Sequence, residues 1–363
     1  MAERVHLHLG LPKTATTYLQ DILWGARDQL ARDGVLLPGD ERRDHLWASR
    51  VVCEDPHLGR HPRRAEEERS SWARLCAEIA AWQGTALISH EFFAGASAEQ
   101  AWRMVEDLAP AQVELVVTAR EPLGLFAASW QESLKNKAVA SIEDYSRTVS
   151  SRPTDIWNWR TLDLRLVLER WSRAVPHDRI HVLPVDTSAP RDDIWHRFAG
   201  VLGLTGEAYD LGESLRNESM GVVEAETLRR VNAHLDSFNN AFDKGVYLRT
   251  FLADERLVPR GGERFWPSGE RIEECRVRGT EAVAYLRAHA IDVVGDIEKL
   301  RVPDDLPPRR TPDSVTDAEM VATATELVAV LLDEVRTLRN ALGQAQSQAQ
   351  SQAISSSRPP GSP

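Results

Sequence analysis

Lysine, cysteine and long hydrophobic runs are all scarce in this sequence. Only five of the 363 residues are lysine, and the three cysteines, Cys53, Cys76 and Cys275, lie far apart. This spacing excludes a disulfide framework and the paired cysteines of zinc or redox sites, and it suits a reducing compartment. No segment is apolar enough to span a bilayer, and the N-terminus lacks the apolar core of a signal peptide. We therefore expect a cytoplasmic protein that does not insert into membranes.

Positive charge is also in short supply. The chain has 44 lysine and arginine residues against 55 acidic ones, which gives a net charge of −11. Because nucleic-acid binding depends on positive charge, we expect no nucleic-acid partner. A polyanionic ligand would need the basic residues to converge at one place.

The sequence does contain a regular alternation of strand-like and helix-like segments. Val5, Leu7 and Leu9 alternate with polar residues, which predicts a first strand. Further strands are predicted at 86–89, 113–118 and 179–184, and helices at 14–30, 123–136, 192–202, 222–235 and 271–289. Strands that alternate with helices predict an α/β fold, with a parallel sheet between two layers of helices.

The composition of the chain changes after residue 300. We expect one domain over 1–300, followed by a proline-rich linker over 301–314. An amphipathic helix is predicted over 315–343, and a disordered tail rich in glutamine and serine over 344–363.

The predicted C-terminal helix has apolar residues in a heptad pattern. They are Val321, Val328, Val335 and Leu342 at one position, and Ala324, Leu331 and Leu338 at the other. β-Branched residues and leucines in this arrangement favour a two-stranded coiled coil, and hence a homodimer through this helix. Because the pattern spans only three heptads, packing of the helix on its own domain is an equal alternative.

The first predicted strand runs into a segment rich in hydrogen-bond donors. Gly10 to Pro12 break the strand, and Lys13 is followed by three threonines at the expected start of a helix. A helix N-terminus has unpaired N–H groups and a favourable dipole, so this segment predicts an anion site. The Walker loop of nucleotide triphosphatases is longer, with four residues between its two glycines. Only two residues separate Gly10 from Lys13, which predicts a loop for one phosphate.

This segment resembles the 5′-phosphosulfate loop of sulfotransferases that use 3′-phosphoadenosine-5′-phosphosulfate (PAPS). The family reads Pro-Lys-(Ser/Thr)-Gly-Thr-Thr, and this chain reads Pro12-Lys13-Thr14-Ala15-Thr16-Thr17, with alanine in place of glycine. The family also has an aromatic residue after the threonines, an arginine at the end of a later strand and a serine in the next helix. The matching residues are Tyr18, Arg120 and Ser129. The Arg120–Ser129 spacing is nine, where the family has eight. The chain is similar to sulfotransferase-like proteins of actinobacteria.

The resemblance implies a P-loop-type fold and PAPS as co-substrate, without a metal. In this reading the residues from Pro12 to Thr17 hold the 5′-phosphosulfate, Arg120 and Ser129 hold the 3′-phosphate, and Tyr18 stacks on adenine. Lys13 then neutralises the charge that develops on the bridging oxygen. The glycine- and arginine-rich 3′-phosphate loop of the family has a weak counterpart at 260–264.

Transfer to a hydroxyl also requires a base. In a parallel sheet, ligands bind beyond the carboxyl ends of the strands, and the run 86–89 ends in His90 and Glu91. Neighbouring residues in extended backbone point to opposite sides, so one of the two faces the site. We favour Glu91 as the base, then His90, with His45 as a third candidate.

The expected acceptor is a small molecule or a carbohydrate. Trp130, Trp157 and Trp159 either line its pocket or belong to the core. The alternative function is an ATP- and Mg²⁺-dependent small-molecule kinase, in which Glu91 would help to hold the metal. The short loop and the Arg120–Ser129 pair favour the sulfotransferase.

Overall fold

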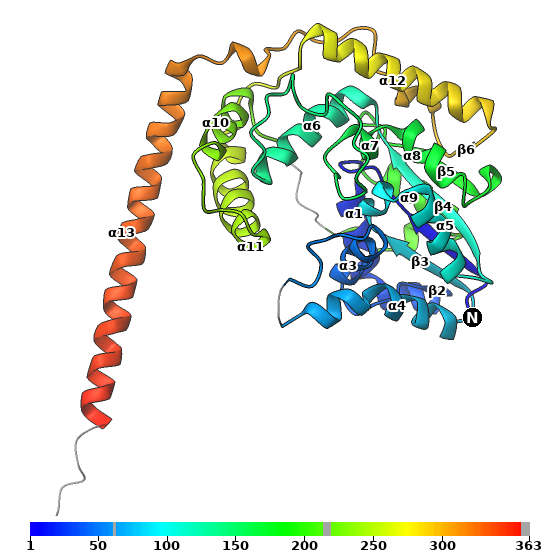
Figure 1. Ribbon diagram of the computed structural model, residues 1–363, viewed down its shortest axis with the longest axis horizontal. Helices are drawn as coiled ribbons and strands as arrows, with labels where there is room; N and C mark the ends of the chain where they lie inside the picture. Colours follow the sequence, from blue (N-terminus) through cyan, green and yellow to red (C-terminus); the bar gives the residue numbers. More distant parts are fainter. Residues whose placement is uncertain (61–62, 213–218, 357–363) are drawn as a thin grey trace, which may run out of the picture.

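A parallel sheet forms the centre of the computed structural model, which describes residues 1–60, 63–212 and 219–356 (Figure 1). Within these residues six strands pair in the order β2-β3-β1-β4-β5-β6, and every pair is parallel. The strands are β1 (Arg4–His8), β2 (Val35–Leu36), β3 (Thr85–Ser89), β4 (Gln112–Ala119), β5 (Ile180–Pro184) and β6 (Asp292–Val293). The predicted α/β class with a parallel sheet is confirmed.

Helices cover both faces of the sheet. One face packs on α3 (Arg42–Val52), α4 (Ala65–Ala81), α5 (Ala98–Asp107), α6 (Pro122–Lys135), α7 (Trp159–Leu162), α8 (Leu164–Trp171) and α12 (Gly269–Ala288). The other face packs on α1 (Thr16–Gly25), α2 (Arg27–Arg32) and α9 (Asp193–Val201). Val5 and Leu7 of β1 point to the first face, whereas His6 and His8 are buried on the second.

The strand order places a topological switch point at the carboxyl end of β1. β1 lies between β3 and β4, with Leu7 in register with Ile88 and Leu115. The chain leaves β1 toward α1 on one face, but leaves β3 and β4 toward α5 and α6 on the other. Ligands of open α/β sheets bind where neighbouring connections diverge in this way. The loop after β1, the pair His90–Glu91 and Arg120 all follow strands at this edge.

One long segment of the domain forms a π-helix, which has more residues per turn than the predicted α-helices. η4 (Lys244–Leu257) is a π-helix that follows α10 (Val222–Asn232) and α11 (Ala241–Asp243), and it packs against α6. Its wider turn does not repeat every 3.6 residues, which is why periodicity did not predict it. π-Helical turns occur frequently at functional sites.

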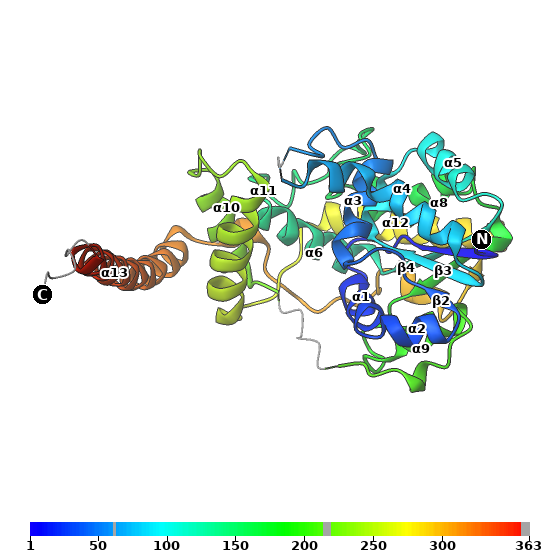
Figure 2. The same cartoon turned by 90° about the horizontal axis from the view of Figure 1, so that it is seen from below.

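The C-terminal helix α13 (Asp317–Ser356) projects away from the sheet, with α10 and α11 between them (Figure 2). It continues past the predicted end at 343, so the predicted disordered tail is helical as far as Ser356. Residues 357–363 of that tail lie outside the described part of the chain. The segment 301–316 before α13 contains one short 3-10 turn, η7 (Pro312–Ser314). None of the described helices is both long and apolar enough to cross a membrane.

Candidate functional site

The segment after β1 turns through three residues with left-handed backbone. The φ angles are +41° at Gly10, +68° at Lys13 and +66° at Ala15. Since Thr14 does not have a positive φ, the sign of φ changes twice from Lys13 to Ala15. Such alternation makes a concave nest of N–H groups, which binds anions. Left-handed backbone is costly for lysine and alanine, and strain of this kind collects at functional sites.

Gly10 allows the loop to fold closely onto β1 and α1. A Cβ atom at this position would lie 2.5 Å from the Thr16 hydroxyl oxygen. It would also lie 3.3 Å from the His8 ring and from the Thr118 hydroxyl. A side chain here would therefore push the loop away from the strand, in addition to the cost of the positive φ.

The start of α1 has hydrogen-bond donors without acceptors. Within the described residues, the backbone N–H groups from Lys13 to Tyr18 donate to no protein group, and α1 has no side-chain cap. The Thr16 side chain is 4% exposed, and its hydroxyl also lacks a partner in the described chain. A buried unpaired hydroxyl costs about 1–3 kcal/mol. A ligand oxygen that reached this hydroxyl would remove that cost, and Thr17 is exposed on the same turn.

The Thr14 side chain turns inward, away from the nest. It is fully buried, and its hydroxyl donates to the Leu11 carbonyl at 2.5 Å. Its oxygen lies 2.8 Å from the Thr118 hydroxyl. Of the three threonines expected to grip a phosphate, Thr14 therefore has only its backbone N–H to offer.

A chain of hydrogen bonds beneath the loop fixes the position of each proton. Because the Thr14 hydroxyl donates to Leu11, it accepts from Thr118. The Thr118 oxygen in turn accepts from Nε2–H of His8, at 3.2 Å. His8 Nδ1 then accepts from the Ser89 hydroxyl, at 2.8 Å. This chain joins β3, β1 and β4 to the loop, and we call it the sub-loop network.

Burial keeps the sub-loop network uncharged. The pKa of His8 is lowered to about 3, chiefly because the ring is desolvated and to a smaller extent because His90 is close. Gln20 of α1 donates to the carbonyl of Ser89 at 2.9 Å and to its hydroxyl at 3.3 Å. The network therefore ties the helix that follows the loop to the strand beside it.

Lys13 contacts a buried carboxylate that the sequence did not reveal. Its Nζ lies 3.1 Å from Oε2 of Glu132 in α6, and Arg249 of η4 pairs with the other oxygen. Burial alone would raise the pKa of the Glu132 carboxyl, but Lys13, Arg249 and Lys135 hold it below its ordinary value. Glu132 is thus an ionised carboxylate, 5% exposed, that is held by two cations.

Arg120 lies over the first turn of α6. Its Nη2 is 2.5 Å from where a Cβ of Gly124 would stand, so a side chain at this position would displace the guanidinium. Its Nε is 3.6 Å from a carboxylate oxygen of Glu121 but buried without a hydrogen-bond partner among the described residues. Glu121 itself accepts from the Gly124 N–H at 2.8 Å as the cap of the helix. Arg120 is therefore able to take a further anionic partner.

Ser129 and Tyr18 both lie in the core. Ser129 is fully buried, and its hydroxyl lies 2.6 Å from the Tyr145 hydroxyl, so it is already paired away from Arg120. Tyr18 is 8% exposed, and the Arg191 guanidinium lies 4.9 Å from its ring centroid. A base stacked on Tyr18 would have to share the ring with Arg191.

Of the two base candidates after β3, only Glu91 has a free acceptor. His90 Nδ1 accepts the Phe92 N–H at 3.1 Å, so in the neutral ring the proton is on Nε2. Burial lowers the pKa of His90 in spite of the nearby Glu91 carboxylate, which favours that neutral ring. Nε2 of His90 is then a donor. Glu91 is half-buried at the start of η1 (Glu91–Gly95).

His45 is a structural histidine. It is fully buried in α3, with Nε2–H donating to the Pro38 carbonyl at 2.8 Å and Nδ1 accepting from the Ser89 N–H at 3.2 Å. Burial lowers its pKa to about 4. Since both ring nitrogens are occupied, His45 has no position from which to accept a proton from a substrate.

Of the three tryptophans, two lie in the core and one lies near the base candidates. Trp130 and Trp159 are fully buried. Trp157 is half-buried, 6.5 Å from the Phe92 ring, which in turn lies 4.8 Å from the His90 ring. Trp157 is thus the one of the three that borders the base candidates.

The segment 260–264 contributes to two different contacts. Arg260 pairs with Glu224 of α10 and with Glu326 of α13, so it fastens the C-terminal helix. Arg309, whose pKa is lowered by burial and then by Arg264, also interacts with Glu121 beside Arg120. Arg264 and Arg309 therefore add positive charge on the Arg120 side.

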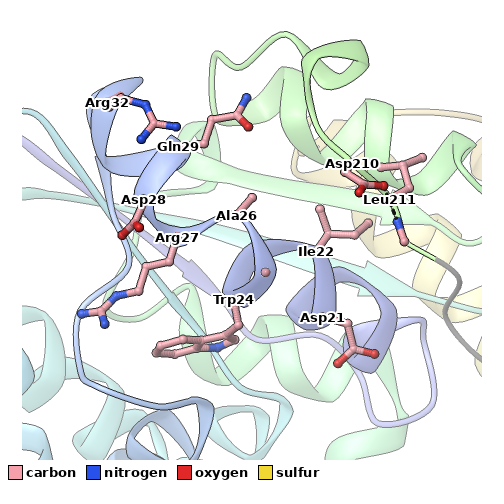
Figure 3. A pocket seen from close by; sticks show the side chains of 12 residues that line it. Asp21, Ile22, Trp24, Ala26, Arg27, Asp28, Gln29, Arg32, Asp210 and Leu211 are labelled. Atoms are coloured by element: carbon pink, nitrogen blue, oxygen red, sulfur yellow. Dashed lines mark hydrogen bonds between the residues drawn. The ribbon is translucent and has the colours of Figure 1, made fainter.

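A separate pocket lies along the second half of α1 (Figure 3). It has a volume of about 700 Å³ and is lined by Asp21, Ile22, Trp24, Gly25, Ala26, Arg27, Asp28, Gln29, Arg32, Asp210, Leu211 and Gly212. None of the residues from Gly10 to Thr17, and none that follows β3 or β4, contributes to this lining. The pocket is therefore distinct from the nest.

Comparison with known proteins gives little. No protein-family model and no curated protein matches the chain. One solved structure that matches part of the chain is a sulfotransferase from Alicyclobacillus acidocaldarius, at 13% identity and a TM-score of 0.39. The match covers 58% of this chain and 86% of that one. Similarity at this level assigns no activity.

Proposed function

We propose that the protein is a PAPS-dependent sulfotransferase that acts on a hydroxyl or amine of a small-molecule or carbohydrate acceptor. The observation that carries this proposal is the nest from Lys13 to Thr16, with its open N–H groups and the unpaired, buried Thr16 hydroxyl. A nest of this length fits a single phosphate and its attached sulfuryl group. PAPS also has a 3′-phosphate, for which Arg120 is the candidate partner.

In the proposed reaction the acceptor oxygen attacks sulfur in line with the bridging oxygen. The new O–S bond forms as the bond between sulfur and the 5′-phosphate oxygen breaks, and adenosine 3′,5′-bisphosphate leaves. Glu91 takes the acceptor proton, and Lys13 neutralises the charge on the departing oxygen. His90, with its proton on Nε2, is suited to donating a hydrogen bond to the acceptor or to the sulfuryl oxygens.

The ion pairs of Lys13 support this role because they allow the lysine to move. If Lys13 were the sole partner of Glu132, its departure would leave a buried charge unpaired, at a cost of several kcal/mol. Arg249 also pairs with Glu132, so the carboxylate stays neutralised when Lys13 turns to a ligand. Arg249 is thus proposed to release Lys13 for the reaction.

The kinase alternative agrees less well with the loop. In Walker loops the hydroxyl directly after the lysine binds Mg²⁺. Here that residue is Thr14, whose hydroxyl donates to Leu11 and accepts from Thr118 inside the sub-loop network. The chemistry of the donor set therefore favours PAPS over ATP–Mg²⁺.

The proposal is tested by thermal stabilisation with adenosine 3′,5′-bisphosphate in the presence of EDTA. A ligand at 100 times its Kd stabilises the folded state by about 2.7 kcal/mol. We expect Thr16→Val to melt at or above the wild-type temperature without ligand, because its hydroxyl has no partner in the described protein. We expect the same variant to lose most of the stabilisation by the bisphosphate.

Thr227→Val is the matched control. The Thr227 hydroxyl in α10 is also buried and unpaired within the described chain, but it is remote in sequence from the nest. This variant should keep the full response to the bisphosphate. Stabilisation by ATP–Mg²⁺ alone, or an undiminished response of Thr16→Val, would contradict the proposal.

A further inference from the structure

α13 packs on the domain along one stripe near its beginning. Thr323 and Leu327 are buried where α13 meets α10, and Glu334 pairs with Arg256 of η4. From Val335 to Gln350 every residue is exposed. The helix is therefore anchored over its first half, and its second half extends past the domain (Figure 1).

A second stripe on α13 is apolar, and all of its members except the half-buried Leu331 are exposed. This heptad seam consists of Val321, Ala324, Val328, Leu331, Val335, Leu338 and Leu342. Val321, Leu338 and Leu342 are 63%, 67% and 59% exposed, although side chains of this kind gain most from burial. At about 100° per residue, the centre of the seam lies roughly 90° around the helix from Thr323 and Leu327. From Val335 to Gln350, where every residue is exposed, a partner on the seam would not displace the domain.

We propose that the heptad seam is the interface with a second copy of this chain, in a parallel two-stranded coiled coil. β-Branched residues at one seam position and leucines at the other favour two strands.

The projecting half of α13 gives an independent reason for a partner. Helices without tertiary packing are marginally stable in water, and most helical stability in proteins comes from a buried apolar face. From Val335 to Gln350, α13 has no such face against the described part of its own chain. Pairing of the seam with a second copy provides one for each helix.

The experiment is the mass of the full chain by light scattering during size-exclusion chromatography. We expect twice the 40.7 kDa of one chain. We expect Val335→Asp/Leu338→Asp to return the mass to 40.7 kDa, with its melting temperature unchanged because both positions are exposed. Thr337→Asp/Asn340→Asp adds the same charge to the same turns outside the seam, and should keep the doubled mass.

The parallel register is tested with Leu342→Cys under a mild oxidant. In a parallel pair the two cysteines meet, and the chain should run as a crosslinked dimer without reductant. Asn340→Cys, on the outer side, and the wild type, whose cysteines are buried or half-buried, should not crosslink. A wild-type mass of one chain, a mass of three or more chains, or a doubled mass in the two-aspartate seam variant would overturn the proposal.

Discussion

Replacing Thr118 with valine tests whether the sub-loop network orders the anion loop. Valine matches threonine in shape but removes the hydroxyl that donates to Thr14 and accepts from Nε2–H of His8. Thr14 keeps its bond to the Leu11 carbonyl, so its loss is small. His8 is fully buried and is left with an unpaired N–H, which costs about 1–3 kcal/mol. We expect a net loss of about 2 kcal/mol.

The assay is thermal unfolding without ligand, followed by titration with adenosine 3′,5′-bisphosphate. At about 2 °C per kcal/mol for a chain of this size, the melting temperature should fall by about 4 °C. The affinity for the bisphosphate should fall as well, because the network holds the backbone that forms the nest. Thr118→Ser keeps the hydroxyl and should retain the affinity.

Thr227→Val is again the control, because it removes a buried hydroxyl without removing a hydrogen bond. It removes a buried hydroxyl that has no partner in the described residues, so it should not lower the melting temperature. If Thr118→Val melts at or above the temperature of Thr118→Ser, the network does not stabilise the loop and the reasoning fails.

Three further predictions follow from the site. Ala15→Gly should raise the free energy of unfolding by about 1 kcal/mol in a denaturant titration, because φ at this position is +66°; a loss of stability would contradict this. Arg249→Gln should lower kcat at least tenfold with little change in bisphosphate affinity, since Glu132 would then retain Lys13. Adding Glu132→Gln to that variant should restore kcat. Failure of this rescue would refute the release mechanism. Burial lowers the pKa values of His6, His8 and His45 to about 4, 3 and 4, so these three rings stay neutral in the fold. In the unfolded chain they are protonated below about pH 6.5, so each should cost about 1.4 kcal/mol of stability per pH unit as the pH falls from 6.5 toward 4. A melting temperature that is constant between pH 7 and pH 5 would contradict this.

The parts of the site that follow strands were predictable from the sequence. The alternation of polar and apolar residues located β1, and apolar runs located β3 and β4, although the sequence did not reveal the strand order. Parallel strands bring their carboxyl ends to one edge of the sheet. The loop after β1, the pair His90–Glu91 and Arg120 were therefore expected to lie at the same edge. Their roles in catalysis remain predictions.

Side-chain direction within the site was not predictable. Thr14 and Thr16 are alike in sequence, but the left-handed turns at Lys13 and Ala15 send one hydroxyl into the network and leave the other unpaired. The positive φ of Ala15 also had no signal, because alanine does not mark such a position.

The ion pairs of Lys13 were missed for a different reason. Glu132 and Arg249 lie in segments more than 100 positions apart, and they meet only because η4 packs against α6. A single sequence offers no signal for that contact. A buried glutamate within the apolar stretch of α6 was the one hint available.

The open donors from Lys13 to Tyr18 belong to the peptide backbone, which all amino acids share. Alanine scanning exchanges side chains and leaves these N–H groups in place. A scan of the loop would therefore detect effects on binding at Lys13 and Thr16 but none from the backbone N–H groups. Amide-to-ester replacement, one position at a time, is the substitution that reaches them. If the nest binds an anion as proposed, conventional mutagenesis would therefore assign to two side chains a binding energy to which several peptide N–H groups contribute.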